Sequence, residues 1–177
     1  MLDFPILLML IGIPGSGKSS WLSKQEKVLI DGGTYLKIIP DRLKMTHDHN
    51  IGVLFHVVCP DEIRKRKTGN ISDQNMNTVV WQEAKDETIG CLDHGTNVLL
   101  DATNVNTFYR NVFIHDLKCK LWAKLFSVEP QIAYERIKKA LDSGIDRATV
   151  PEEVVYKMYG EYLYSIKMLE SEGFKIL

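Results

Sequence analysis

The sequence predicts one domain with an α/β fold, a three-layer sandwich in which helices cover a mainly parallel central sheet. The length of 177 residues falls within the range of one domain that buries most of its unfolded surface in a single core. With 45% hydrophobic and 25% charged residues, the composition is that of an ordinary globular protein. Strand-like apolar runs alternate with helical patterns, which is typical of α/β layers. These runs are residues 6–11, 35–39, 53–58, 98–100 and 121–128.

The first run lies in the longest apolar stretch, Phe4 to Ile13, which is half of the roughly 20 residues that a membrane span needs. No basic residue precedes it as in a signal peptide, so we interpret it as a buried strand and expect no membrane partner. The three cysteines are widely spaced and form no C-x-x-C pair, which predicts a reducing, cytoplasmic setting. A formal net charge of -1 argues against a protein that coats nucleic acid by bulk electrostatics, although a local basic groove remains open.

Two helices are predicted from apolar spacing. After Asn77, apolar residues recur at helical spacing until His94 and Gly95. Near the end of the chain, Thr149 and Glu152 have the spacing of a capping box and start a second helix. Gly173 is expected to end that helix, before a last short strand in 174–177.

A phosphate-binding loop follows the first strand. The spacing Gly12-x-x-x-x-Gly17-Lys18-Ser19 fits the Walker A pattern and lies between a buried strand and the start of a helix, as the mechanism requires. Its backbone N–H groups would surround phosphate oxygens of ATP, Lys18 would bridge the β- and γ-phosphates, and Ser19 would ligate Mg²⁺. The expected nucleotide-binding residues are Gly12, Pro14, Gly15, Ser16, Gly17, Lys18, Ser19 and Ser20.

The sequence also favours transfer of the phosphoryl group to an acceptor molecule over hydrolysis by a switch or motor protein. It contains no N-K-x-D guanine motif, and 177 residues leave little room for the sensor and lid modules of a mechanical ATPase. Asp41 in "IIPDRLK" follows the second strand-like run, which predicts a position at the carboxyl end of a parallel strand, where ligands bind. There it would act as general base toward a hydroxyl, beside Arg42 and Lys44, which would hold an anionic substrate or be ordinary surface charges.

A second carboxylate follows the run 98–100. In "VLLDATN", Asp101 ends an apolar run and is followed by Thr103 and Asn104, which resembles a Walker B strand with its carboxylate at the strand terminus. The alternative is a buried aspartate that caps the next helix. On spacing alone, both interpretations stay open.

Several segments together resemble the P-loop polynucleotide kinase family, a group of small P-loop kinases that includes the phage 5′-hydroxyl kinase domain. They occur in order over nearly the whole chain: "GIPGSGKSSW", "PDRLK", "GNISDQ", "LLDATNVN" and "VPEEVVYKMY". The resemblance implies a P-loop kinase fold, ATP with Mg²⁺ as donor, and a nucleic-acid 5′-hydroxyl as a common acceptor. A DNA or RNA partner is therefore expected.

The resemblance also implies roles for single residues. Lys18 and Ser19 match the phosphate and metal residues, and Asp41 matches the general base of a D-x-x-R element. That element ends in an arginine that holds a substrate phosphate, whereas Lys44 stands there and lacks the planar two-pronged grip. Asp101 and Asn104 match a D-x-T-N element, in which the aspartate positions basic groups.

The resemblance further implies a lid, here expected around 136–150, that places an arginine over the β- and γ-phosphates. Arg147 is the first candidate and Arg136 the second, and Lys139 is a further basic candidate. Arginines of this type contribute roughly 10³- to 10⁵-fold in rate.

A segment around 46–67 is longer than in the family and is interpreted as an insertion that adds a strand and a basic helix to the acceptor groove. It contains His47, His49, His56 and Cys59, whose spacing matches no usual zinc pattern.

Three functions follow as hypotheses. The first is a kinase that phosphorylates a nucleic-acid 5′-hydroxyl. The second has the same fold but acts on a hydroxymethylated base in phage DNA or on a small nucleotide or metabolite. The third is a regulatory module that only hydrolyses ATP. The sequence does not distinguish DNA from RNA and predicts no oligomeric state.

Overall fold

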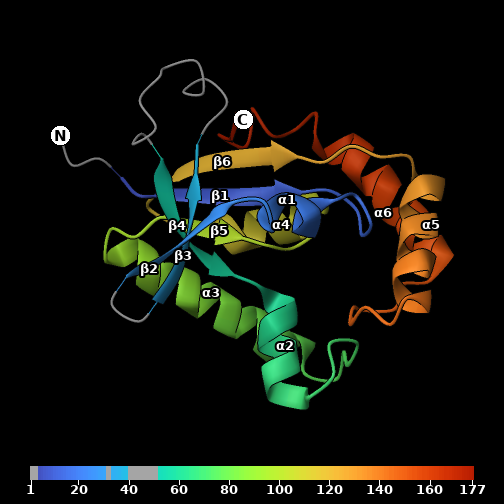
Figure 1. Cartoon of the computed structure of the whole chain (residues 1–177). Helices are drawn as coiled ribbons and strands as arrows, with labels where there is room; N and C mark the ends of the chain where they lie inside the picture. Colours follow the sequence, from blue (N-terminus) through green and yellow to red (C-terminus); the bar gives the residue numbers. More distant parts are fainter. Residues whose placement is uncertain (1–3, 31–32, 40–51) are drawn as a thin grey trace.

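The computed structural model describes residues 4–30, 33–39 and 52–177, which form a sheet and its covering helices (Figure 1). All predicted strands and both predicted helices are present. The last helix, however, ends at Ser165 rather than at Gly173, and its N-cap is Pro151 without a side-chain hydrogen bond, so the capping box predicted from Thr149 is wrong. The elements are β1 (Ile6–Ile11), α1 (Lys18–Leu22), β2 (Glu26–Ile30), β3 (Gly33–Ile38), β4 (Val53–Val58), α2 (Pro60–Thr68), α3 (Asn77–Asp93), β5 (Val98–Leu100), α4 (Thr107–Ile114), β6 (Lys120–Leu125), α5 (Pro130–Asp142), α6 (Glu152–Ser165) and β7 (Lys175–Ile176).

The sheet has seven strands in the order β2-β3-β4-β5-β1-β6-β7. The five strands from β4 to β7 in this order are parallel, and β1 lies at their centre between β5 and β6. Figure 1 shows the arrowheads of β1 and β6 at the same edge of the sheet, where α1 begins. This confirms the predicted α/β fold with a mainly parallel sheet of the P-loop kinase type.

The two faces of the sheet build two hydrophobic clusters. Leu7, Met9 and Ile11 of β1 face a large cluster with buried residues of α3, α5 and α6. Leu8 and Leu10 face the other way, toward a smaller cluster that includes Trp21 and Leu22 at the α1 side. Because successive side chains of a strand point to opposite faces, β1 is buried on both sides, as its continuous apolar run predicts.

The hairpin formed by β2 and β3 is the part of the sheet that departs from the prediction. β2 was not expected, and β3 runs antiparallel to β4, with Ile38 opposite Val53. The strand of the segment expected as an insertion, β4, pairs in parallel with β5 and is therefore part of the parallel sheet. The hairpin of β2 and β3 is the antiparallel addition to these five strands, and the insertion itself stays a prediction.

Among the described residues, no helix has both the length and the apolar character that crossing a membrane would require.

Candidate functional site

At two positions, the Walker A loop has a backbone geometry that only glycine adopts readily. Gly15 and Gly17 have φ angles of 79° and 100°, in the left-handed region. A Cβ on Gly15 would also lie 2.3 Å from the carbonyl oxygen of Ala133 in α5, so the loop and α5 approach each other closely. The loop is tied to the "DATN" segment, because the Gly12 amide donates to the Thr103 carbonyl at 3.0 Å.

Lys18, at the start of α1, lies over this loop. Its Nζ donates to the carbonyl oxygens of Gly12 at 2.7 Å and Ile13 at 3.1 Å. Burial lowers the pKa of Lys18 to about 8, and the nearby carboxylates of Asp101 and Asp61 oppose that shift. An ammonium group is therefore held at the mouth of the loop with two carboxylates close to it.

The remaining residues of the loop differ in their exposure. Ser16 is buried and its Oγ has no hydrogen-bond partner, whereas Pro14 is half-buried. Ser19 and Ser20 are exposed in the first turn of α1. An exposed hydroxyl at this position suits the metal role expected of Ser19.

Asp101 directly follows β5, at the edge of the sheet where β1 ends. Its amide donates to the Val58 carbonyl at 2.9 Å, which fixes it beside β4. Burial raises the pKa of Asp101 to about 6, while the Lys18 ammonium lowers it and the Asp61 and Glu62 carboxylates raise it further. The carboxylate and Lys18 therefore act on each other, as expected for an aspartate that positions a basic group.

Asn104 differs from its expected role in substrate binding. It has a φ of 50°, and its side-chain amide donates to the carbonyl oxygens of Leu10 at 2.9 Å and Leu100 at 3.3 Å. These contacts tie the ends of β1 and β5 together. Arg110 stabilises this turn by donating to the Asn104 carbonyl at 2.7 Å. Arg110 is buried and forms an ion pair with Glu172. Asn104 thus holds the loop in place rather than presenting its amide to a substrate.

The position predicted for the general base rests on a strand direction that is wrong. β3 is antiparallel to β4, and its last residue, Ile38, pairs with the first residue of β4, Val53. The end of β3 therefore lies at the edge where β4 begins, opposite to the edge that carries the Walker A loop. Asp41, Arg42 and Lys44 themselves lie outside the described residues.

A second D-x-x-R spacing occurs at the carboxyl end of β4, a strand that is parallel to β5 and β1. Asp61 and Arg64 lie in the first turns of α2, and the Asp61 carboxylate is close enough to influence the pKa of Lys18, Asp101 and Arg147. Arg64 is 5% exposed and donates to Asp61 Oδ1 and, at 3.1 Å, to Asn77 Oδ1. The signal was visible in "CPDEIR", which has the same spacing as "PDRLK" and ends in an arginine.

Both candidate lid arginines lie near the loop. Arg136, on α5, places Nη1 3.4 Å from the Gly15 carbonyl. Arg147, after α5, is half-buried, and burial lowers its pKa while Asp61 raises it. Its charge also lowers the pKa of Lys18, so Arg147 lies close enough to act on the ammonium group and on the Asp61 carboxylate. Lys139 is exposed on α5.

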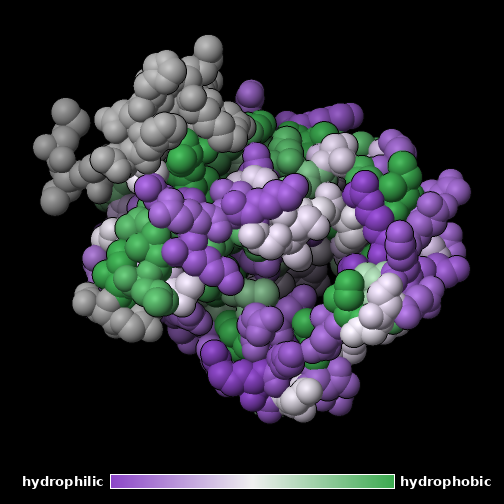
Figure 2. All heavy atoms as spheres, viewed as in Figure 1, coloured by the Kyte–Doolittle hydropathy of each residue, from purple (hydrophilic) through white to green (hydrophobic). Residues whose placement is uncertain are grey.

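Two contacts join the segment after α5 to the region around α2. Lys65 Nζ lies 2.6 Å from Asp146 Oδ2, and the Thr149 amide donates to Ser72 Oγ at 3.3 Å. Figure 2 shows a hollow near the centre of the view, bordered by residues of mixed hydropathy. The chain therefore bends over the site from the α5 side and meets α2 and the loop that follows it.

Three buried side-chain atoms of the described residues lack a hydrogen-bond partner, and all three belong to this site. They are Ser16 Oγ, Arg64 Nε and Arg147 Nε. Buried polar groups in folded proteins are nearly always paired, so unpaired ones call for an explanation. One hydroxyl and two guanidinium donors around a phosphate-binding loop suit an anionic ligand.

Of the histidine and cysteine residues of the expected insertion, the structure describes His56 and Cys59. Nε2 of His56 lies 2.7 Å from Glu87 Oε1, and burial raises the pKa of Cys59 to about 12, so its thiol stays protonated. No group of three metal-ligating side chains occurs among the described residues, and His47 and His49 fall outside them.

The chain is similar to several known structures. A chain of the Pnkp1/Rnl/Hen1 RNA repair complex superposes with a TM-score of 0.68 at 19% identity, over 94% of this chain and 47% of that chain. A second structure of the Pnkp1/Rnl/Hen1 complex gives 0.54 at 21% identity, over 77% of this chain and 40% of that one. A "putative kinase" from Chloroflexus aurantiacus gives 0.57 at 13% identity, over 88% and 76%. These likenesses show the fold, and the chain spans less than half the length of the first two structures.

A search of curated protein sequences finds no match. The family model described as "AAA domain" matches residues 7–162, from β1 into α6. Since this match covers the Walker A loop, Asp61, Asp101 and both arginines, the chain belongs to the AAA domain family and has the P-loop kinase fold.

Proposed function

We propose that the protein is an ATP-dependent kinase that transfers the γ-phosphoryl group of ATP to a hydroxyl of a nucleic acid, with a 5′-hydroxyl end as the first acceptor. The observation that carries this proposal is the set of unpaired buried donors, Ser16 Oγ, Arg64 Nε and Arg147 Nε, around a Walker A loop. A kinase needs such donors, because phosphoryl transfer is catalysed mainly by positioning and by neutralising charge.

The roles within this proposal follow from position. The amides of Gly15 to Ser19 and the Lys18 ammonium bind the β- and γ-phosphates. Asp61 takes the place that the sequence suggested for Asp41, since it follows a parallel strand and faces Lys18 and Arg147. It would accept the proton of the attacking hydroxyl. The bond from that oxygen to the γ-phosphorus forms, the bond to the β,γ-bridging oxygen breaks, and ADP leaves.

Mg²⁺ fits the oxygen donors at this site. The Ser19 hydroxyl is exposed at the start of α1 and would hold the ion, and oxygen ligands are the ones that Mg²⁺ prefers. When bound, the ion would neutralise charge on the phosphates. Asp101 would keep Lys18 oriented toward them, since the two groups shift each other's pKa.

Arg147 and Arg136 would share the lid role. Arg147 has an unpaired buried Nε and faces Lys18 and Asp61, so we assign it to charge on the transferred group. Arg136 would act at the Gly15 end of the loop, where its guanidinium already lies 3.4 Å from the carbonyl.

The test is transfer of label from γ-labelled ATP to matched DNA and RNA oligonucleotides with a 5′-hydroxyl, each paired with the same oligonucleotide carrying a 5′-phosphate. Label is expected only on the 5′-hydroxyl members. If neither DNA nor RNA ends accept label while hydroxymethylated bases or small hydroxyl compounds do, the nucleic-acid end is the wrong acceptor. Hydrolysis of ATP that no acceptor changes would instead support a regulatory module.

A further inference from the structure

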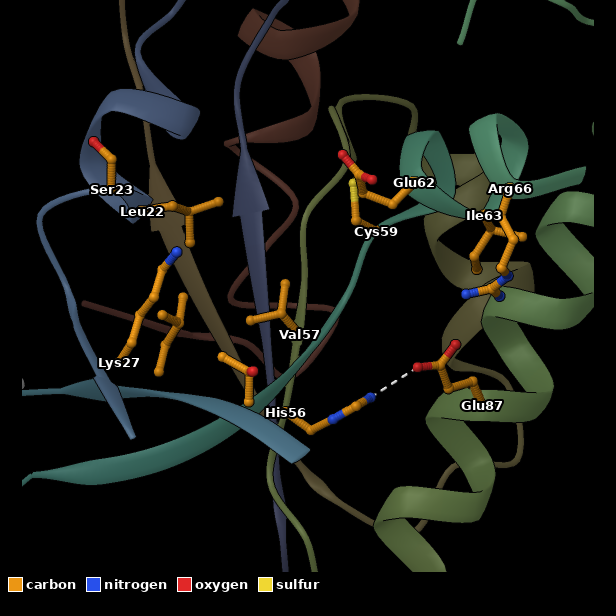
Figure 3. Close-up of a pocket in the computed structure, with 12 residues that line it drawn as sticks. Leu22, Ser23, Lys27, His56, Val57, Cys59, Glu62, Ile63, Arg66 and Glu87 are labelled. Carbon is orange, nitrogen blue, oxygen red and sulfur yellow. Dashed lines mark hydrogen bonds and ion pairs between the residues drawn. The ribbon is translucent and has the colours of Figure 1, made fainter. Parts of the chain in front are cut away.

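A pocket beside the proposed general base is built partly by the added hairpin. It has a volume of about 490 Å³ and lies between the hairpin of β2 and β3, the end of α1, and the β4 to α2 connection. Figure 3 shows Lys27, Leu22 and Ser23 on one side of it and Ile63, Arg66 and Glu87 on the other. We call it the hairpin pocket.

The lining of the hairpin pocket combines an apolar base with a polar rim. Leu22, Leu36, Val57 and Ile63 supply aliphatic side chains, of which Leu36 and Ile63 are buried. The rim carries charges of both signs, which come from Lys27, Arg66, Glu62 and Glu87. His56 also belongs to the rim, where its ring is held by Glu87 at 2.7 Å (Figure 3).

One wall of the hairpin pocket is built by residues that flank Asp61 in the chain. Cys59 and Glu62 line the pocket, and Asp61 lies between them in the chain at the start of α2. The carboxylates of Asp101 and Asp61 both act on the Cys59 thiol, where they add to the effect of burial in raising its pKa. A ligand in the pocket is therefore next to the residues that would activate its hydroxyl.

We propose that the hairpin pocket receives the terminal nucleoside of the acceptor, with the hydroxyl directed toward Asp61. This inference rests on the proposed kinase function. Ligand sites of roughly 300 to 1,000 Å³ hold small molecules, so one nucleoside fits. The aliphatic base suits the flat faces of a nucleobase, and Glu62 and Glu87 can accept hydrogen bonds from sugar hydroxyls or base N–H groups.

The charge of the rim favours one nucleoside over a longer stretch of nucleic acid. Two carboxylates offset the two permanent cations, Lys27 and Arg66, and Arg66 is already paired with Glu83 at 2.5 Å. A run of phosphates needs a surplus of cations. The strand beyond the first nucleoside would therefore leave the pocket, and the acceptor KM should stop improving after the first few nucleotides.

A second cavity, of about 560 Å³, lies between α3 and α4 and contains Trp81 and Tyr109. It is a weaker candidate, because neither neighbour of Asp61 in the chain lines it, whereas the hairpin pocket contains Glu62. Binding of the nucleoside at Trp81 or Tyr109 is the alternative outcome that the experiments must separate.

The first experiment fills the hairpin pocket from its rim. Thr34 is exposed on β3 and lines the pocket, so Thr34→Trp should raise the acceptor KM at least tenfold and leave the KM for ATP unchanged. Ile30→Trp is the control, since Ile30 is next to Leu29, the partner of Thr34 in the hairpin, and so points to the other face, is 38% exposed and does not line the pocket. Equal acceptor KM values for both variants, with melting temperatures like that of the original protein, would overturn the inference.

The second experiment does not depend on catalysis. A 5′-hydroxyl oligonucleotide with a photoreactive thio-base as its first nucleotide is cross-linked to the protein, and the attached peptide is identified by mass spectrometry. Attachment within 27–36 or 56–66 is expected, and attachment at Trp81 or Tyr109, or none at all, would refute the assignment. If label transfer fails but the hairpin peptides are cross-linked, the kinase proposal fails while nucleoside binding stands.

Discussion

β3 and β4 both lead into a proline and an aspartate, yet they run in opposite directions through the sheet. Pro40 and Asp41 follow β3, and Pro60 and Asp61 follow β4. β4 is parallel to β5, so its carboxyl end lies at the Walker A edge, whereas β3 ends opposite the start of β4. We therefore expect Asp61, rather than Asp41, to meet the phosphate.

The same difference separates two basic residues. Arg64 lies three residues after Asp61, is buried and reaches both Asp61 and Asn77. Lys44 has the corresponding spacing after Asp41 and lies outside the described residues. If catalysis belongs to the end of β4, substitutions there should affect the reaction strongly and their counterparts after β3 should not.

The largest effect is expected at the arginine that faces the end of β4. Arg147→Ala should lower kcat by roughly 10³- to 10⁵-fold, because a guanidinium that neutralises the transferred group contributes about that much. Single-turnover label transfer measures it. The control is Lys139→Ala, an exposed residue on α5, which should stay within a few fold. A larger loss for Arg136→Ala than for Arg147→Ala would exchange the roles of the two arginines.

Next in size is the pair of aspartates. Asp61→Asn should lower kcat by roughly 10²- to 10⁴-fold, the range of general-base catalysis, and leave ATP binding intact. Asp41→Asn should change kcat only a few fold, because β3 ends at the other edge of the sheet. Label transfer and nucleotide binding are measured on both variants. A larger loss of kcat for Asp41→Asn than for Asp61→Asn would contradict the assignment of the general base to the end of β4.

A moderate effect is expected from Arg64→Lys. Lysine keeps the charge but cannot contact Asp61 and Asn77 with one planar group, so the acceptor KM should rise roughly 10- to 100-fold, as expected for one or two lost charged hydrogen bonds. Lys44→Ala should leave that KM unchanged. Since Arg64 is buried, thermal unfolding must show that the variant is folded before its KM is interpreted.

The smallest effect concerns pH. Transfer requires ionised Asp101 and protonated Lys18, so kcat/KM for ATP should fall below about pH 6 and above about pH 8. Asp101→Asn should remove the acidic limb from the residual activity. An acidic limb that persists unchanged in this variant would assign it to another group.

The same two pKa values predict a cost in stability. Asp101 has a raised pKa, so its contribution to the free energy of unfolding falls as pH rises from about 4 to about 6. Lys18 has a lowered pKa, so its contribution recovers as pH rises from about 8 toward 10.5. Asp101→Asn should therefore raise the melting temperature more at pH 7 than at pH 4. A gain of equal size at both values would contradict this linkage.

The sequence by itself determined the phosphate site. The Walker A spacing, the apolar run of β1 and the position of Asp101 after β5 are local patterns, and the structure places all three at one edge of the sheet. Both candidate lid arginines were named from the sequence, and in the structure Arg136 lies 3.4 Å from the Gly15 carbonyl while the charge of Arg147 acts on Lys18, but their role as a lid stays a prediction. A pattern of a few residues is enough to predict a site when the strand, the turn and the helix that form it follow each other directly in the sequence.

Only the tertiary structure shows which aspartate follows a parallel strand and which groups Asn104 contacts. An apolar run predicts a strand but not its direction, since direction depends on the connection to the previous strand. Parallel neighbours need a crossover of about a dozen residues or more, whereas a two-residue turn makes an antiparallel hairpin. The Asp31-Gly32 pair before β3 is such a turn signal. Burial and pairing partners come from the whole fold, so the contacts of Asn104 and the position of Asp61 were visible only there, and the catalytic role of Asp61 stays a proposal.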